Sequence, residues 1–148
     1  MGPLAALDIT RFARAMQVNA CAPLVLTQLA IPLLAERRGL IVNITSDAAR
    51  GAYAGWGAYG ASKAAVELLT NTLAAELKDL GVSAVVVDPG DMRTRMHQEA
   101  FAGEDISDRP LPEVTEPFWR WLFDQPAGGI SGERFAAQQE AARWLQQA

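Results

Sequence analysis

The sequence has 148 residues, of which half are hydrophobic and a fifth charged, and its formal net charge is −4. This composition is typical of an ordinary soluble globular protein with a sizeable core and excludes an intrinsically disordered chain. The acidic balance disfavours nucleic acids and anionic membranes as partners, because surfaces that bind phosphates are usually basic. A single cysteine, Cys21, and a single histidine, His97, leave no internal disulfide and no Cys/His zinc cluster. We therefore expect one domain, residues 1–148, in a reducing compartment.

The first ten residues, MGPLAALDIT, contain neither a basic segment nor an apolar core, so we predict no signal peptide. The apolar runs are short or are interrupted by proline, arginine or aspartate, and we expect none of them to span a membrane. The sequence therefore predicts a cytoplasmic protein.

Residues 8–36 are predicted to form one long helix, which Asp8 or Thr10 can cap. Pro23 interrupts this helix. Because proline has no amide N–H, the carbonyl of Asn19 loses its helical donor, and we expect a kink there.

The rest of the chain alternates between strands and helices. Short apolar runs rich in isoleucine and valine predict buried strands at 39–45 and 82–88, and a third strand is expected within 130–137. Helices are predicted at 59–80 and 112–123. This alternation predicts an α/β fold with a parallel sheet of about three strands and flanking helices.

Two further segments lack a regular pattern. Residues 91–110 are polar and irregular, and we expect a mobile flap there. Residues 138–148 are predicted to add a helical turn or to fray.

A group of polar residues suggests a chemical function. Tyr59 and Lys63 are spaced i, i+4, so they lie on one helical face, and Ser46 follows the strand at 39–45. A hydroxyl, a phenol and an ammonium group together suggest proton transfer to or from a substrate oxygen. A lone Tyr-x-x-x-Lys is weak evidence, because such a tyrosine is more often a core or interface residue.

Additional motifs accompany this group. Pro89-Gly90 ends the strand at 82–88, Thr94 follows four residues after the glycine, and Asn19 lies in the first helix in VNACAPL. With these residues the sequence resembles the C-terminal portion of the short-chain dehydrogenase/reductase family over nearly the whole chain. The segment SGERF looks like the last strand of that family. The resemblance implies a partial Rossmann-like, three-layer fold.

The resemblance also implies roles for the polar residues. Tyr59 would be the general acid/base at the substrate oxygen. Because a free phenol titrates near ~10, it needs the positive charge that Lys63 would supply. Lys63 would also bind the ribose of NAD or NADP, Ser46 would hold the substrate oxygen, and Asn19 would hold a relay water. The Asn19 carbonyl that Pro23 frees would suit that last role.

The resemblance implies cofactor contacts in two segments, the helix start that carries Tyr59 and Lys63 and the residues after the strand at 82–88. The segment after the second strand matches the part of the family that packs against the nicotinamide. The implied cofactor-binding residues are Tyr59, Lys63, Pro89, Gly90, Met92 and Thr94.

Each role has a structural alternative. Pro89-Gly90 can be only a turn that ends a strand, Thr94 a cap, and Asn19 a buried polar residue satisfied at the kink. An acyl-transfer pair of Ser46 with His97 is disfavoured, because the serine has no Gly-x-Ser-x-Gly context and His97 is expected to be solvated.

The sequence departs from the family in its first half. The phosphate-binding turn Thr-Gly-x-x-x-Gly-x-Gly does not occur here. Gly51, Gly55 and Gly57 match part of it, but they lie several residues after a strand and overlap the approach to Tyr59, so we reject them as a substitute. We expect a truncated form, a fragment or a split half that is weakly active or inactive alone.

The sequence thus predicts an NAD(P)-dependent oxidoreductase that reduces a carbonyl or oxidises a secondary alcohol of small-molecule size. The alternative is a non-catalytic dimerisation or regulatory module, and a weaker third is non-redox proton transfer. In the family, helices equivalent to 8–36 and 59–80 form a dimer interface, so the resemblance implies a homo-oligomer.

Overall fold

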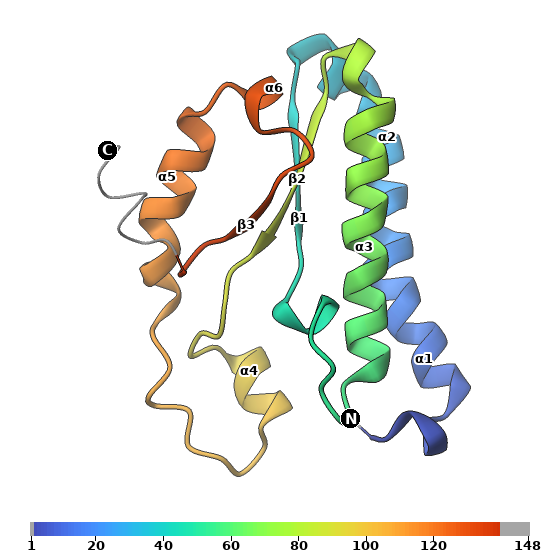
Figure 1. Cartoon of the computed structure of the whole chain (residues 1–148), viewed down its shortest axis with the longest axis vertical. Helices are drawn as coiled ribbons and strands as arrows, with labels where there is room; N and C mark the ends of the chain where they lie inside the picture. The colour runs from blue at the N-terminus through green and yellow to red at the C-terminus, as the bar shows by residue number, and fades with distance from the viewer. Residues whose placement is uncertain (1, 140–148) are drawn as a thin grey trace. The chain divides into compact units, whose positions relative to one another are not determined.

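The computed structural model describes residues 2–139 (Figure 1). These residues form two compact units, one of residues 2–88 with 126–135 and one of residues 89–125 with 136–139. The first unit carries the sheet and the long helices. The single domain expected from the sequence stays a prediction.

The predicted first helix begins where expected. The carboxylate of Asp8 accepts from the amide N–H of Thr10 at 2.9 Å, which caps α1 (Ile9–Met16). A π-helical turn (Gln17–Cys21) follows, and α2 (Ala22–Arg37) continues the helix.

This π-helical turn lies where the sequence predicted a kink. The amide N–H of Ala22 donates to the carbonyl of Gln17, five residues back rather than the four of an α-helix. Pro23 comes directly after that turn, in the first positions of α2. A wider turn accommodates a residue that has no N–H and whose ring crowds the preceding carbonyls.

The helical stretch Ile9–Arg37 is long and apolar enough to cross a membrane by length and composition alone. It spans 29 residues with a mean hydropathy of 1.7 in its most apolar window, and only 11% of that window is buried. The interrupted apolar runs of the sequence predicted no such segment. Because core helices of soluble proteins meet the same criteria, length and hydropathy do not by themselves make it a membrane span.

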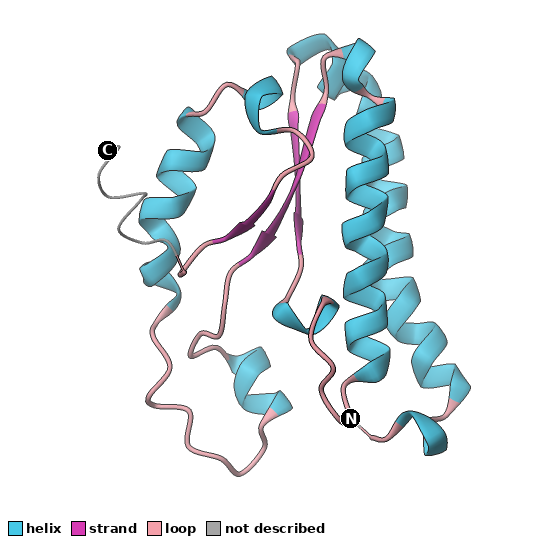
Figure 2. Cartoon of the chain, in the orientation of Figure 1, coloured by secondary structure: helices cyan, strands magenta, loops and turns pink. Residues whose placement is uncertain are grey.

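The sheet has the strand order β1-β2-β3 (Figure 2). β1 (Leu40–Ile44) and β2 (Ser83–Asp88) pair in parallel, with Leu40 opposite Ser83 and Ile44 opposite Val87. Every residue of β2 is buried, which is the burial expected of a strand covered on both faces. The third strand, β3 (Arg134–Ala136), is shorter than the predicted segment, because α6 (Ala127–Ile130) and a turn occupy the residues before it.

α3 (Gly57–Glu76) connects β1 to β2, and a 3-10 turn (Lys78–Leu80) ends it before Gly81, whose φ is +71°. Leu73 and Leu77 from the end of this connection pack with Ile41 of β1 and Ala84 of β2. Leu24, Ile31, Leu34 and Ala35 of α2 pack against the same cluster. The helices α2 and α3 therefore cover one face of the sheet (Figure 1).

The second unit contains α4 (Arg95–Ala100), a 3-10 turn (Pro112–Thr115) and α5 (Glu116–Asp124). The predicted helix at 112–123 is confirmed. The flap predicted at 91–110 is wrong in part, because α4 lies inside it. Most of the predicted tail, residues 140–148, lies outside the described residues. The α/β fold class, with its three-stranded parallel sheet flanked by helices, is confirmed.

Candidate active site

Tyr59 and Lys63 lie one turn apart on α3, as their spacing predicts. The Nζ atom of Lys63 is 5.6 Å from the centroid of the Tyr59 ring. Trp56, one turn before Tyr59, makes an edge-to-face contact with the same ring at a centroid distance of 5.7 Å. The helix therefore presents a phenol and an ammonium group to one small volume.

Lys63 also connects α3 to the end of β1. Its Nζ donates a hydrogen bond of 2.9 Å to the carbonyl of Ile44, the last residue of that strand and two residues before Ser46. Burial lowers the pKa of the Lys63 ammonium below its ordinary value. The ammonium is thus fixed between the helix that carries the phenol and the strand that leads to the serine.

The hydroxyl of Ser46 is held by its own loop. Its Oγ accepts from the amide N–H of Ala48 at 3.2 Å and donates to the carboxylate of Asp47 at 2.9 Å, so Ser46 caps the 3-10 turn Asp47–Ala49. The hydroxyl of Tyr53 donates to Asp47 at 2.6 Å and, with weaker help from Ser46, holds the pKa of that carboxyl below its ordinary value against the opposing effect of burial. This network orients the serine side chain.

Asn19 reaches α3 from the π-helical turn. Its Nδ2 donates to Oγ of Ser62 at 2.9 Å, and the Ser62 hydroxyl donates to the carbonyl of Tyr59 at 2.7 Å. Ser62 is fully buried. Asn19 therefore braces the turn of α3 that carries Tyr59, and its role in holding a relay water stays a prediction.

Gly60 allows the loop that contains Ser46 and the turn Asp47–Ala49, here called the serine loop, to approach α3 closely. A Cβ atom at this position would lie 2.5 Å from the carbonyl oxygen of Ala48, which is closer than real Cβ contacts. The backbone of the 3-10 turn that follows Ser46 therefore rests directly on the helix beside Tyr59.

Pro89, Gly90, Met92 and Thr94 belong to the second unit. The side-chain amide of Gln138 donates to the carbonyls of Pro89 and Asp91, both at 2.9 Å, and Gly90 has a φ of +75°. Met92 is partly buried. The role of these four residues at a nicotinamide stays a prediction.

Thr94 and His97 are linked in α4. The Oγ1 atom of Thr94 accepts from the amide N–H of His97 at 3.1 Å, so Thr94 is the N-cap of this helix. The His97 ring stacks on Phe101 with a centroid distance of 4.7 Å, and its side chain is 11% exposed. The expectation that His97 is solvated is therefore wrong.

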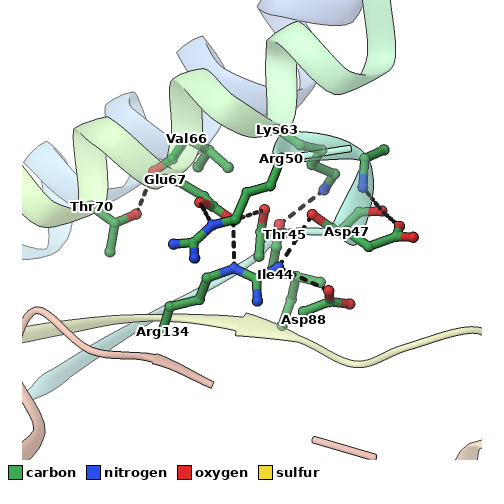
Figure 3. A network of polar contacts seen from close by, with 12 residues as sticks. Ile44, Thr45, Asp47, Arg50, Lys63, Val66, Glu67, Thr70, Asp88 and Arg134 are labelled. Carbon is green, nitrogen blue, oxygen red and sulfur yellow. Dashed lines mark hydrogen bonds and ion pairs between the residues drawn. The ribbon is translucent and has the colours of Figure 1, made fainter. Parts of the chain in front are cut away.

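Sequence reasoning missed a group of charged residues beside the serine loop. Glu67 of α3, Asp88 of β2 and Arg134 of β3 are joined by ion pairs (Figure 3). The one signal in the sequence was Glu67, which follows Lys63 by four residues on the same helical face. Among the described residues, no group of three or more His, Cys, Asp or Glu side chains is arranged to hold a metal ion.

The parallel sheet, with polar residues from the end of β1 and the start of the next helix, defines an α/β protein of the Rossmann-like class. A family model described as short chain dehydrogenase matches residues 1–105, more than half of the chain. The chain belongs to this family of oxidoreductases.

Individual relatives agree with this assignment. The chain is 38% identical over 125 residues to the uncharacterized oxidoreductase YciK of Escherichia coli K12, covering 83% of this chain and 49% of the relative. A putative short chain dehydrogenase of Shigella flexneri, complexed with NADP, matches with a TM-score of 0.84 at 32% identity, over 93% of this chain and 57% of that chain. One from Escherichia coli CFT073, complexed with NADPH, matches with a TM-score of 0.84 at 33% identity, over 93% and 57%.

The chain thus spans about half the length of these three relatives. The activity of a whole short chain dehydrogenase is therefore a proposal for this chain.

Proposed function

We propose that Ser46, Tyr59 and Lys63 form the proton-transfer site of an NAD(P)-dependent oxidoreductase that interconverts a carbonyl compound and a secondary alcohol. One observation carries the proposal. The Lys63 ammonium lies 5.6 Å from the Tyr59 ring and is hydrogen-bonded to the end of the strand that leads to Ser46.

In reduction, the Tyr59 hydroxyl gives its proton to the substrate oxygen as negative charge develops there, and in oxidation the phenolate removes that proton. The Lys63 charge stabilises the phenolate, which an unassisted phenol would form only near pH ~10. Ser46 turns its single O–H donor from Asp47 to the same oxygen and fixes the position of that oxygen relative to Tyr59. Asn19 supports this arrangement through Ser62.

The donor set at Lys63 fits a nicotinamide ribose. A lysine ammonium has three N–H donors, and the Ile44 carbonyl takes one of them. The remaining donors suit the ribose hydroxyls of NAD or NADP. The family resemblance is the support for assigning Pro89, Gly90, Met92 and Thr94 to the nicotinamide. A nicotinamide bound there supplies or accepts the hydride.

The fit does not extend to the pyrophosphate. The glycine-rich turn that holds this group in the family does not occur in the sequence, so we expect this chain alone to bind the cofactor weakly and to turn over slowly. The substrate is a small carbonyl compound or alcohol.

The test combines calorimetric titration with NADPH and NADH and an assay of carbonyl reduction by the loss of reduced-cofactor absorbance. Wherever turnover is measurable, Tyr59→Phe is expected to lower kcat by about 10²-fold or more, with an unchanged circular dichroism spectrum. Tyr53→Phe removes the other phenol of the chain and is the matched control, with a much smaller loss expected. Equal activity of Tyr59→Phe and the wild type would refute the assignment.

A second candidate function is a dimerisation module, and the surface of α2 favours it. Leu26, Leu29 and Leu33 recur at helical spacing on α2, each more than three-fifths exposed, and Leu68 of α3 is equally exposed. We propose that these helices mediate homo-oligomerisation. This surface serves either function, so the presence of an oligomer does not decide between them.

A further inference from the structure

A cluster of largely buried charges lies at the carboxyl ends of β1 and β2 (Figure 3). The Nε atom of Arg134 is 2.8 Å from a carboxylate oxygen of Glu67, and its Nη2 is 2.9 Å from Asp88. The three side chains are 19%, 12% and 9% exposed, in that order. They come from β3, α3 and β2, so one guanidinium joins three elements of the first unit. We call Glu67, Asp88 and Arg134 the carboxyl-end clamp.

The clamp holds the residues around the proposed catalytic serine. The Thr45 hydroxyl donates to Glu67 at 2.8 Å, and the Thr45 amide N–H donates to the Val87 carbonyl at 2.8 Å. The Nη2 of Arg134 also makes a longer contact of 3.4 Å with the carbonyl of Ser46. Glu67 of α3 therefore holds the residue before Ser46, and the guanidinium of β3 contacts the peptide that follows Ser46.

The clamp also includes a residue of α3, the helix that carries Tyr59. Glu67 lies one turn after Lys63 on α3. A shift of Glu67 relative to Thr45 would change the separation of α3 from the end of β1. That separation sets where the Tyr59 hydroxyl and the Ser46 hydroxyl lie relative to each other.

The partners of Glu67 and Arg134 hold both side chains in their charged forms. Burial alone would raise the pKa of Glu67, but hydrogen bonds from Arg134, Thr45 and Arg50 outweigh it and lower that pKa. Burial likewise opposes the charged form of Arg134, and its hydrogen bonds to Glu67 and Asp88 raise its pKa nonetheless. Arg50 also contacts Glu67, at 3.1 Å, but its side chain is 62% exposed.

We infer that Arg134 and Glu67 are positioning residues for the proton-transfer site, acting on Ser46 through Thr45 and the Ser46 carbonyl. The catalytic consequence rests on the proposed function, whereas the positioning of the serine peptide does not. A planar guanidinium can serve carboxylates on two sides at once, and the point charge of a lysine cannot.

The experiment compares Arg134→Lys with Arg50→Lys in the full chain. Both substitutions keep the positive charge and remove the Nε donor that contacts Glu67, so they differ in the contacts that Arg134 makes to Asp88 and Ser46. The readouts are the amide ¹⁵N and ¹H resonances of Thr45 and Ser46, the thermal midpoint, and kcat and KM wherever the wild type turns over. Arg134→Lys is expected to shift both amide resonances and to lower kcat by about 10²-fold with little change in KM, because a small displacement of a reacting group has that effect. Arg50→Lys is expected to leave the resonances in place and kcat within about twofold.

Glu67→Gln provides the conservative comparison, because its amide oxygen can still accept from Thr45 and Arg134. It is expected to retain the Ser46 resonance better than Glu67→Ala, which removes both contacts. Unmoved amide resonances in Arg134→Lys, or equal movement in Arg50→Lys, would overturn the inference. The inference would also be overturned if Arg134→Lys moved both resonances but kept the kcat of the wild type. If the wild type shows no turnover and binds neither NADPH nor NADH, the proposed function fails on its own, and the resonances alone decide for or against the positioning role.

Discussion

The Cβ atom that Gly60 lacks determines how closely the serine loop approaches α3. A methyl group there would meet the backbone oxygen of Ala48 at 2.5 Å, and a backbone atom cannot move aside as the tip of a side chain can. Helix propensity alone would favour alanine by about 1 kcal/mol. Overpacking costs about 1–3 kcal/mol, so the steric effect is expected to win.

Gly60→Ala is therefore expected to lower the free energy of unfolding by about 1 kcal/mol, measured by urea denaturation. Gly128→Ala is the control, because a Cβ atom at that helical glycine meets nothing within 4 Å. It is expected to be neutral or slightly stabilising. Equal stability of Gly60→Ala and the wild type would mean that the loop moves away at no cost.

The charge of Glu67 makes a pH-dependent contribution to stability. Its pKa in the folded chain lies below the ordinary value of 4.5, so the native state favours the ionised form. The stabilisation is complete above the unfolded-state pKa and is lost as the pH falls through the folded-state pKa. We expect the free energy of unfolding to drop between about pH 5 and pH 3, and Glu67→Gln to flatten that drop.

Asp47 and Asp8 also have lowered pKa values and act in the same direction, so the comparison of variant with wild type isolates Glu67. Thermal unfolding at a series of pH values measures both curves. Parallel curves for Glu67→Gln and the wild type would show that the Glu67 carboxylate is not stabilised by its partners.

At the scale of elements, local sequence signals located most of the first unit. β1 and β2 are short apolar runs that end at polar residues or at Pro89, and the Asp8 cap marks the helix start where it occurs. α4 was missed because six residues are too few to show a helical period. The one feature of the sequence that marks the start of α4 is its N-cap residue, Thr94.

The clamp could not be predicted because its partners are far apart in sequence. Arg134 and Glu67 are separated by 67 positions, and only the pairing of β3 beside β2 brings them together. Tyr59 and Lys63, by contrast, are neighbours through helical spacing alone. The pair Tyr59 and Lys63 could therefore be predicted without the family resemblance, because helical spacing alone brings the two side chains together.

The cap of α4 gives a prediction at this scale. Thr94→Ala removes the side chain that accepts from the His97 amide N–H, and an N-cap contributes about 1 kcal/mol. Because opening is favoured by about that amount, amide hydrogen exchange within α4 is expected to accelerate by about fivefold. Thr94→Ser keeps the oxygen acceptor and is expected to behave as the wild type. Unchanged exchange in Thr94→Ala would show that the cap does not stabilise α4.

At the scale of the whole molecule, the isolated chain leaves apolar side chains of α2 and α3 exposed to water. Leu29 is 73% exposed and Leu33 67% exposed on α2, and the stretch Ile9–Arg37 is apolar enough to meet the length and hydropathy criteria of a membrane span. Burying a leucine side chain contributes about 1.5–3 kcal/mol. Several such side chains at one interface would offset the entropy lost on association.

We therefore expect Leu29→Asp to shift the chain toward the monomer, with sedimentation velocity at micromolar concentration as the measurement. A buried aspartate at the interface would be desolvated without a partner, whereas in the monomer it stays in water. Leu111→Asp is the matched control, since it introduces the same charge at an exposed leucine outside α2 and α3 and is expected to leave the mass distribution unchanged. A wild-type mass of one chain at that concentration would refute the oligomer directly. A wild-type oligomer that Leu29→Asp leaves intact would place the interface elsewhere, and the exposed face of α2 would then lose its proposed role.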